Sequence, residues 1–101
     1  MSGYILGSDA ARDLDTIWDY IAKDNIDAAD RWTAKLFEAF ESLGQTPGMG
    51  HRREDLTRLP VLFWPVGAYV VIYRAERSPV EIVAVTQGSR DIPSFLSSRM
   101  R

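Results

Sequence analysis

The sequence predicts a single α+β domain in which a helical hairpin packs on an antiparallel sheet of three to four strands. Two observations lead to this prediction. The N-terminal half repeats apolar residues at helical spacing, and the C-terminal half holds three runs rich in β-branched and aromatic residues. With a short strand at 4–7, the expected order is β-α-α-β-β-β, followed by a short helix or tail over 88–96. The length of 101 residues leaves room for one domain, placed at residues 1–101.

The first helix is indicated by one apolar stripe that recurs every three or four residues. Ser8 stands where an N-cap belongs, and the pair Asp24-Asn25 is expected to end the helix. Charged side chains fall outside the stripe, so the helix is amphipathic and buries one side. The stripe consists of Ala10, Leu14, Ile17, Trp18 and Ile21.

A second amphipathic helix is expected to begin near Asp27, and Gly44 followed by Pro47-Gly48 is expected to stop it. Phe37 lies about 100° away from its apolar stripe and is a spare aromatic. Because only a short turn separates the two helices, they should form an antiparallel hairpin. The stripe consists of Ala29, Trp32, Leu36, Phe40 and Leu43.

Three strands are expected after a charged, glycine-containing loop, at 59–66, 69–75 and 80–87. Gly67 makes a tight turn between the first two strands, and 76–79 makes the turn between the second and third. Short turns of this kind enforce antiparallel pairing, so the C-terminal half should form a meander.

Proline content and hydrophobicity distinguish these strands from one another. Pro60 and Pro65 cannot donate to a ladder, so the first strand should be irregular or lie at an edge there. The run 70–72 is apolar on both faces, which suits a strand covered on both sides. The hairpin would cover one face, and a partner chain is one candidate for the other.

Charge is unevenly distributed along a chain whose net charge is −2. Residues 1–47 hold nine acidic and four basic side chains, a balance of −5, whereas 48–101 hold five acidic side chains and eight arginines, a balance of +3. Two interpretations stay open: the helices are simply acidic, or the arginine-rich half faces an anionic partner.

Residue usage excludes several kinds of chemistry. With no cysteine and one histidine, disulfides, thiolate nucleophiles and multi-histidine metal sites are excluded, and we expect no metal and no cofactor. The N-terminus lacks the basic start and apolar run of a signal peptide. No segment approaches the ~20 apolar residues that span a bilayer. We therefore expect a cytoplasmic protein without a membrane partner.

Five motifs follow one another along the chain. Two lie in the predicted helices, at 11–22 (ARDLDTIWDYIA) and 28–32 (AADRW). The third is the loop 47–56 with its Pro-x-x-Gly-x-x-Arg-x-Asp-Leu pattern. The last two are the strand 69–74 (YVVIYR) and the strand with its exit at 82–91. Each motif alone is weakly specific, but all five in order cover nearly the whole chain, and together they resemble the RelE/ParE superfamily of toxins, with the ParE branch the closer one.

The resemblance implies the toxin of a type II toxin–antitoxin system, neutralised by a small ParD-like antitoxin encoded beside it. In such systems the antitoxin's extended C-terminal segment wraps the helices and sheet of the toxin. The ParE-like branch inhibits DNA gyrase through a binding contact. Direct DNA binding by this chain alone is not expected, because it has no recognition-helix pattern and its net charge is negative. A non-toxic remnant that keeps only its partner contact is an alternative.

The other alternative is a RelE-like, ribosome-dependent mRNA endoribonuclease. Metal-independent RNA cleavage needs a base, an acid and cations, which that branch supplies with lysine and arginine on the sheet and a C-terminal tyrosine. Here Lys23 and Lys35 fall on the predicted helices, Pro93 follows 90–92, and no tyrosine follows Tyr73. We therefore expect a toxin that is not an enzyme and has no catalytic residues.

Two groups of side chains are candidates for binding. Cationic side chains in the loop, within a strand and beyond the last strand suit an anionic target surface. The candidates for target binding are His51, Arg52, Arg53, Arg74 and Arg90. Large apolar side chains without an evident place in the core suit the antitoxin. These are Phe37, Phe63 and Trp64.

Overall fold

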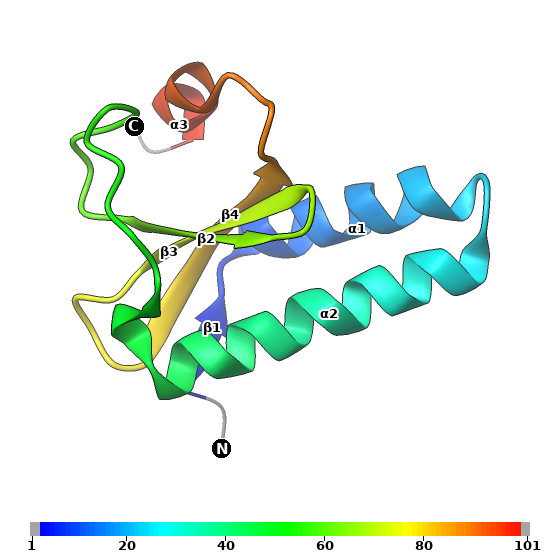
Figure 1. Ribbon diagram of the computed structural model, residues 1–101, viewed down its shortest axis with the longest axis horizontal. Coiled ribbons are helices and arrows are strands. Elements are labelled where there is room, and N and C mark those ends of the chain that lie inside the picture. The colour runs from blue at the N-terminus through cyan, green and yellow to red at the C-terminus, as the bar shows by residue number, and fades with distance from the viewer. Residues whose placement is uncertain (1–2, 100–101) are drawn as a thin grey trace.

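The computed structural model describes residues 3–99 and confirms the predicted α+β class and element order. Figure 1 shows the helical hairpin on one side of the sheet and a C-terminal helix on the other. No helix within 3–99 is long and apolar enough to cross a membrane. The elements are β1 (Tyr4–Leu6), α1 (Ser8–Ala22), α2 (Ile26–Gln45), the 3₁₀-helix η1 (Pro47–Met49), β2 (Leu62–Val66), β3 (Tyr69–Arg74), β4 (Val80–Gln87) and α3 (Ile92–Arg99).

The sheet is mixed, with strand order β1-β4-β3-β2. The predicted meander is confirmed, because β2 pairs with β3 and β3 with β4 in antiparallel fashion. The predicted antiparallel sheet is wrong for β1, which pairs in parallel with β4. The hairpin and the strands β2 and β3 lie between these two strands in sequence, and a connection of this length permits parallel pairing.

The N-caps of both hairpin helices differ from the predictions. Gly7, and not Ser8, is the N-cap of α1, and Ser8 is its first helical residue. Asn25, and not Asp27, caps α2, because its side-chain oxygen accepts a hydrogen bond from the Ala28 N–H at 2.9 Å. Asn25 thus begins the second helix directly after the first has ended, which keeps the connection short.

The prolines act on β2 as predicted. β2 is an edge strand that begins at Leu62 and not at Leu59. Before it, the chain makes a tight bend in which the Val61 N–H donates to the Leu59 carbonyl at 2.8 Å. Pro65 lies within β2, at the outer edge of the sheet.

The sheet separates two hydrophobic cores. The central strand β3 is covered on both faces as predicted: Val71 faces the hairpin and Ile72 faces α3. On its second face the sheet is covered by α3 together with residues 56–61. This chain itself therefore provides the cover for which a partner chain was a candidate. The hairpin core consists of Ala10, Leu14, Ile17, Leu36, Phe40, Leu43, Tyr69, Val71, Tyr73, Val80, Ile82 and Val85. The α3 core consists of Val61, Phe63, Ile72, Ala84, Ile92, Phe95 and Leu96.

Tyr73 connects β3 to the segment that follows α2. Its buried hydroxyl accepts a hydrogen bond from the Gly50 N–H at 2.8 Å and donates one to the Pro47 carbonyl at 2.7 Å. A Cβ at Gly50 would lie 2.5 Å from the hydroxyl oxygen, so only glycine fits there. The Tyr73 hydroxyl therefore provides hydrogen-bond partners for two backbone groups at 47–50. It thereby fixes the position of this segment, from which the loop at 51–58 begins.

Replacing Tyr73 by Phe removes both hydrogen bonds and leaves the buried Gly50 N–H without its acceptor. We expect Tyr73→Phe to lower the free energy of unfolding by about 1–3 kcal/mol in urea titrations. The control is Tyr20→Phe, at an exposed side chain, which should change it by less than about 0.5 kcal/mol. Equal effects of the two variants would contradict the assignment.

Candidate interaction surface

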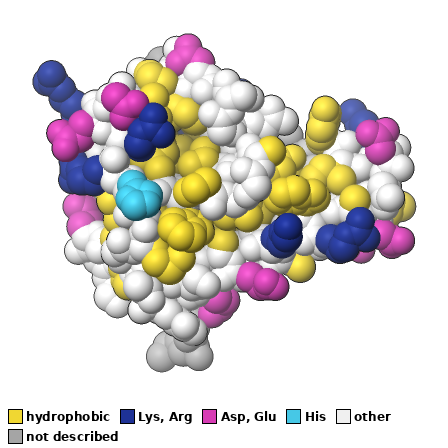
Figure 2. Space-filling model, in the orientation of Figure 1, with side chains coloured by type: hydrophobic (Ala, Val, Ile, Leu, Met, Phe, Trp, Pro, Cys, Tyr) yellow, Lys and Arg dark blue, Asp and Glu magenta, His cyan; other side chains and the backbone are white. Residues whose placement is uncertain are grey.

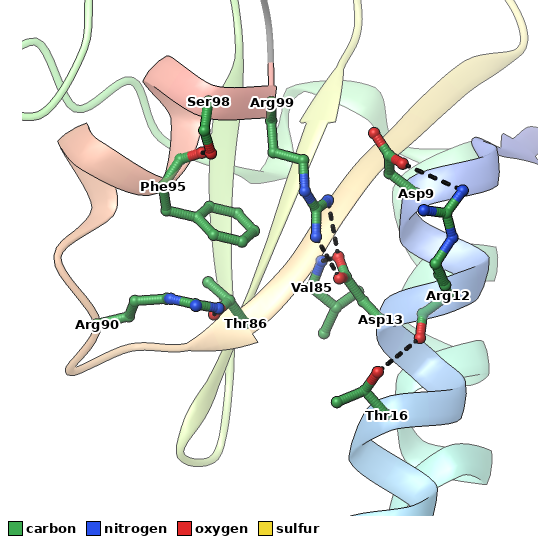
Figure 3. Close-up of polar contacts among 10 residues, drawn as sticks. All are labelled: Asp9, Arg12, Asp13, Thr16, Val85, Thr86, Arg90, Phe95, Ser98 and Arg99. Atoms are coloured by element: carbon green, nitrogen blue, oxygen red, sulfur yellow. Dashed lines mark hydrogen bonds and ion pairs between the residues drawn. The ribbon is translucent and has the colours of Figure 1, made fainter.

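The carboxylate of Asp13 joins three elements at one point (Figure 3). It accepts a hydrogen bond from the Val85 N–H of β4 at 3.0 Å, and both Nη1, at 3.1 Å, and Nη2 of Arg99 in α3 donate to it. The hydrogen bond to Asp13 raises the pKa of the Arg99 guanidinium, and the Asp13 side chain is only 13% exposed. The charged pair therefore fastens α3 to α1 and β4.

Phe95 lies between two guanidinium groups. Arg99 stacks over its ring at 4.5 Å from the centroid and Arg90 at 4.7 Å. Arg90 Nη1 also donates to the Thr86 hydroxyl at 3.3 Å. Within residues 3–99, Arg90 contacts a hydroxyl and a ring but no carboxylate, so its positive charge is not neutralised by a neighbour.

Beside Arg90, a groove of about 200 Å³ runs between α1 and the end of β4. We call it the α1–β4 groove. Its walls carry hydroxyls as well as apolar groups, and Tyr20 at its α1 side is 65% exposed. It is lined by Asp13, Thr16, Ile17, Tyr20, Tyr69, Val85, Thr86, Gln87 and Arg90.

A second, apolar groove of about 260 Å³ lies where α1 and α2 meet, and we call it the hairpin groove. Phe37 is 37% exposed at this groove and packs edge-on against Phe40, with ring centroids 5.5 Å apart. Trp18 closes part of it, held by a hydrogen bond from its Nε1 to Asp30 at 2.9 Å. The lining residues are Leu6, Ala11, Leu14, Asp15, Trp18, Thr33 and Phe37.

The loop at 51–53 presents cations to solvent. His51, Arg52 and Arg53 are all exposed, and Figure 2 shows the histidine beside basic side chains and an apolar area. Arg53 binds Asp55 through two hydrogen bonds of 2.9 and 2.7 Å, which lower the pKa of Asp55 and raise that of Arg53. The backbone of His51 is held by mutual hydrogen bonds with Phe63, at 2.9 and 2.8 Å.

Residues 4–92 match the family model described as ParE toxin of type II toxin–antitoxin system, parDE. The chain belongs to the ParE toxin family. The match spans every strand and both helices of the hairpin, and it ends at the first residue of α3.

One curated relative agrees with this membership, and one solved structure shares the fold. This ParE-family chain is 35% identical over 89 residues to "Putative toxin Y4kP" of Sinorhizobium fredii, a match that covers 86% of the chain and 88% of the relative. It also resembles the solved structure "Chromosomal ParDE TA system from P. aeruginosa", with a TM-score of 0.71 and 20% identity. That likeness covers 86% of this chain and 96% of the other, and it establishes a common fold.

The structure of this ParE-family toxin does not bring the five predicted cationic residues together. His51 and Arg53 line a groove of about 280 Å³ beside the β2–β3 turn. Arg90 lines the α1–β4 groove. Arg74 lies in a cleft at the start of α1 and pairs with Glu81 of β4 at 3.8 Å. The cations are therefore divided among three places, and two of them, Arg53 and Arg74, already have an acidic neighbour.

The three predicted apolar contact residues also differ in accessibility. Phe63 is only 4% exposed, so the expectation that it lacks a place in the core is wrong. The reason is that α3 provides a second core, which Phe63 enters. Trp64 is half-buried against the hairpin core, and Phe37 is the most accessible of the three.

Sequence analysis missed Asp13 and Arg99. Asp13 borders the apolar stripe, between Ala10 and Leu14, and an acidic side chain at such a margin is an indication of a buried partner. The partner itself lies 86 positions away, a separation that no local pattern spans.

Replacing Asp13 by Ala leaves the Arg99 guanidinium and the Val85 N–H without their acceptor. We expect Asp13→Ala to lower the free energy of unfolding by about 2–3 kcal/mol, measured by urea titration, because hydrogen bonds to a charged group are lost from a largely buried site. Asp9→Ala is the matched control, since Asp9 faces Arg12 at 3.8 Å on an exposed surface and should cost less than about 1 kcal/mol. A smaller loss for Asp13→Ala than for Asp9→Ala would refute the role assigned to Asp13.

Proposed function

We propose that this toxin is held inactive by a small ParD-like antitoxin and that the free toxin inhibits DNA gyrase by binding. The observation that carries the proposal is the match of residues 4–92 to the toxin of parDE systems. The likeness to a structure titled as a ParDE system supports the antitoxin as partner. A gyrase target places the toxin in the cytoplasm.

Binding, and not catalysis, is the mode of action that the site residues favour. A catalytic histidine needs a carboxylate or similar group to orient it, and the Asp55 carboxylate, four residues along the same loop, is bound by Arg53. Lys23 is the C-cap of α1, and Lys35 stacks over Trp32 at 5.0 Å on α2. Both lysines thus belong to the hairpin and not to the sheet face where nuclease chemistry would need them.

The hairpin groove is the surface proposed for the antitoxin. It is apolar, and the partly exposed ring of Phe37 offers an anchor of the kind that dominates binding energy in protein interfaces. A helix with an apolar side would bury that side along the groove. Trp64 is proposed to support this surface from the sheet side through the hairpin core.

The loop at 51–53 is the surface proposed for the target. Its three basic or titratable side chains are exposed, and its backbone is anchored to Phe63, so the cations project from a fixed base. Arginine pairs readily with anionic groups because its fork of donors matches carboxylate and phosphate. Arg74 lies outside this loop and pairs with Glu81 at 3.8 Å, so it is not part of the proposed surface.

Co-expression with the antitoxin tests the first half of the proposal. The two chains should elute together in gel filtration at micromolar concentration. Phe37→Glu places a charge in the hairpin groove and should weaken the complex by about tenfold or more, measured by titration calorimetry. Ile26→Glu is the matched control, at an exposed apolar residue of α2 outside the groove, and should leave affinity unchanged. Separate elution of the wild-type chains would overturn the proposed partner.

Brief expression without antitoxin tests the second half. We expect cleaved DNA trapped on gyrase and intact translated messages in the same culture. His51→Ala/Arg52→Ala/Arg53→Ala should abolish the trapping while the antitoxin still binds, because only the exposed loop is changed. Arg77→Ala, at an exposed arginine in the β3–β4 turn, should trap gyrase like the wild type. Cut messages with unaffected gyrase would instead establish a nuclease.

A further inference from the structure

The groove beside the β2–β3 turn is formed jointly by the cationic loop, the sheet and the first residue of α3. We call it the loop groove. Its volume is about 280 Å³, and its lining includes His51, Arg53 and Leu56 of the loop together with residues of β2 and β3 and Ile92. Its apolar residues belong to the α3 core or pack against it, so the groove lies on the face of the sheet opposite the hairpin. The cover that α3 and residues 56–61 give this face therefore leaves an opening beside the loop.

The floor of the loop groove is apolar. Phe63 and Ile92, each 4% exposed, line it from the α3 core. Leu56 and Val70 line it as well, and both are half-buried against the same core. Moving apolar surface from water into a concave site of this kind is favourable, so the groove suits an apolar side chain of a partner.

His51 and Arg53 form the polar rim of the groove, and both are exposed. Arg53 donates to Asp55 through Nε, at 2.9 Å, and through Nη2, at 2.7 Å. Among residues 3–99, no hydrogen bond or ion pair engages Nη1 of Arg53 or the imidazole of His51. These groups can therefore bind a carboxylate that reaches the rim.

The rim is held in place by the rest of the chain. The backbone groups of His51 form mutual hydrogen bonds with Phe63 of β2, at 2.9 and 2.8 Å. Gly50, the residue before it, donates to the Tyr73 hydroxyl at 2.8 Å. The rim therefore loses little conformational freedom when a partner binds, which favours affinity.

The residues of the loop favour a protein segment over nucleic acid as the occupant. Glu54 and Asp55 are exposed in the same loop and would repel a phosphate backbone, which repeats its negative charge along its length. The apolar floor has no use for phosphate either. A peptide, in contrast, can place one carboxylate at the rim and an apolar side chain in the groove beside it.

We infer that the loop groove receives an apolar side chain of gyrase and that a neighbouring carboxylate of the same segment binds Arg53 at the rim. The inference rests on the proposed gyrase target and adds an apolar anchor to a surface proposed there on charge alone. Apolar side chains in desolvated pockets supply much of the energy of protein interfaces, while charges at the rim govern specificity and the rate of association.

Binding of the toxin to purified DNA gyrase, measured with and without a DNA duplex, tests the groove. Val70→Glu places a charge in it and should raise the Kd by at least about tenfold. Val83→Glu is the matched control, because Val83 is also a half-buried strand residue against the α3 core but lies outside the groove. It should bind within about twofold of the wild type. Equal losses in the two variants would overturn the inference, since a general loss of stability would then explain both.

Arg53→Gln tests the carboxylate at the rim. It should raise the Kd by about fivefold, whereas Arg58→Gln, at an exposed arginine of the same loop outside the groove, should leave it unchanged. Salt screens a charge pair, so raising NaCl from about 0.05 to about 0.5 M should weaken the wild type more than Arg53→Gln. Unchanged affinity with equal salt dependence would overturn the rim contact.

A measurement on the wild-type toxin decides the matter if Val70→Glu does not fold. Saturation of gyrase protons should be transferred to the methyl groups of Val70 and Leu56 in the complex more strongly than to those of Val83. Stronger transfer to Val83 would place the contact outside the loop groove and overturn the inference.

The outcomes separate this inference from the proposed function on which it rests. If the wild type binds gyrase but Val70→Glu and Arg53→Gln bind equally well, the groove contact is refuted and the gyrase target stands. If the wild type does not bind gyrase with or without DNA, the proposed target is refuted and the inference with it. If the toxin binds the DNA duplex alone as tightly as it binds gyrase, the occupant is nucleic acid and the inference is refuted.

Discussion

The arrangement of this molecule depends on one carboxylate, that of Asp13, which lies at the contact of α1, β4 and α3. Packing alone would leave α3, a helix of eight residues, weakly fixed, because short helices are marginal in water without tertiary support. The ion pair to Arg99 holds the end of the helix, while Phe95 and Leu96 bury its inner side. The second core, and with it the burial of Phe63, follows from that attachment.

Local patterns predicted the parts of the fold that local physics determines. Val80–Gln87 has the predicted bounds, and the stripe residues Leu14 and Leu36 lie in the hairpin core. Contacts between distant segments were not predictable in this way. The burial of Phe63 could not be predicted from local sequence, because the residues that cover it belong to α3. The N-cap of α2 is Asn25 and not Asp27, because side-chain geometry, and not charge, determines which residue caps the helix.

The candidate site was predictable in composition but not in layout. The arginines of the C-terminal half were recognisable from charge, yet Arg74 and Arg90 lie in different clefts because strand register separates them. The family resemblance supplied the kind of protein, and family membership now agrees with it. What the three-dimensional arrangement adds is the position of three separate surfaces: an apolar hairpin groove, an exposed cationic loop and the α1–β4 groove.

The closed edge of β2 has a consequence for how free copies of this toxin behave. Sheets with an open edge tend to polymerise edge to edge, and proline and strand-end bridges are common protections against it. Pro65 and the His51 bridge protect this edge, and Asp13 with α1 shields most of the other. Few backbone groups at either edge are therefore free to pair with a strand of a second copy.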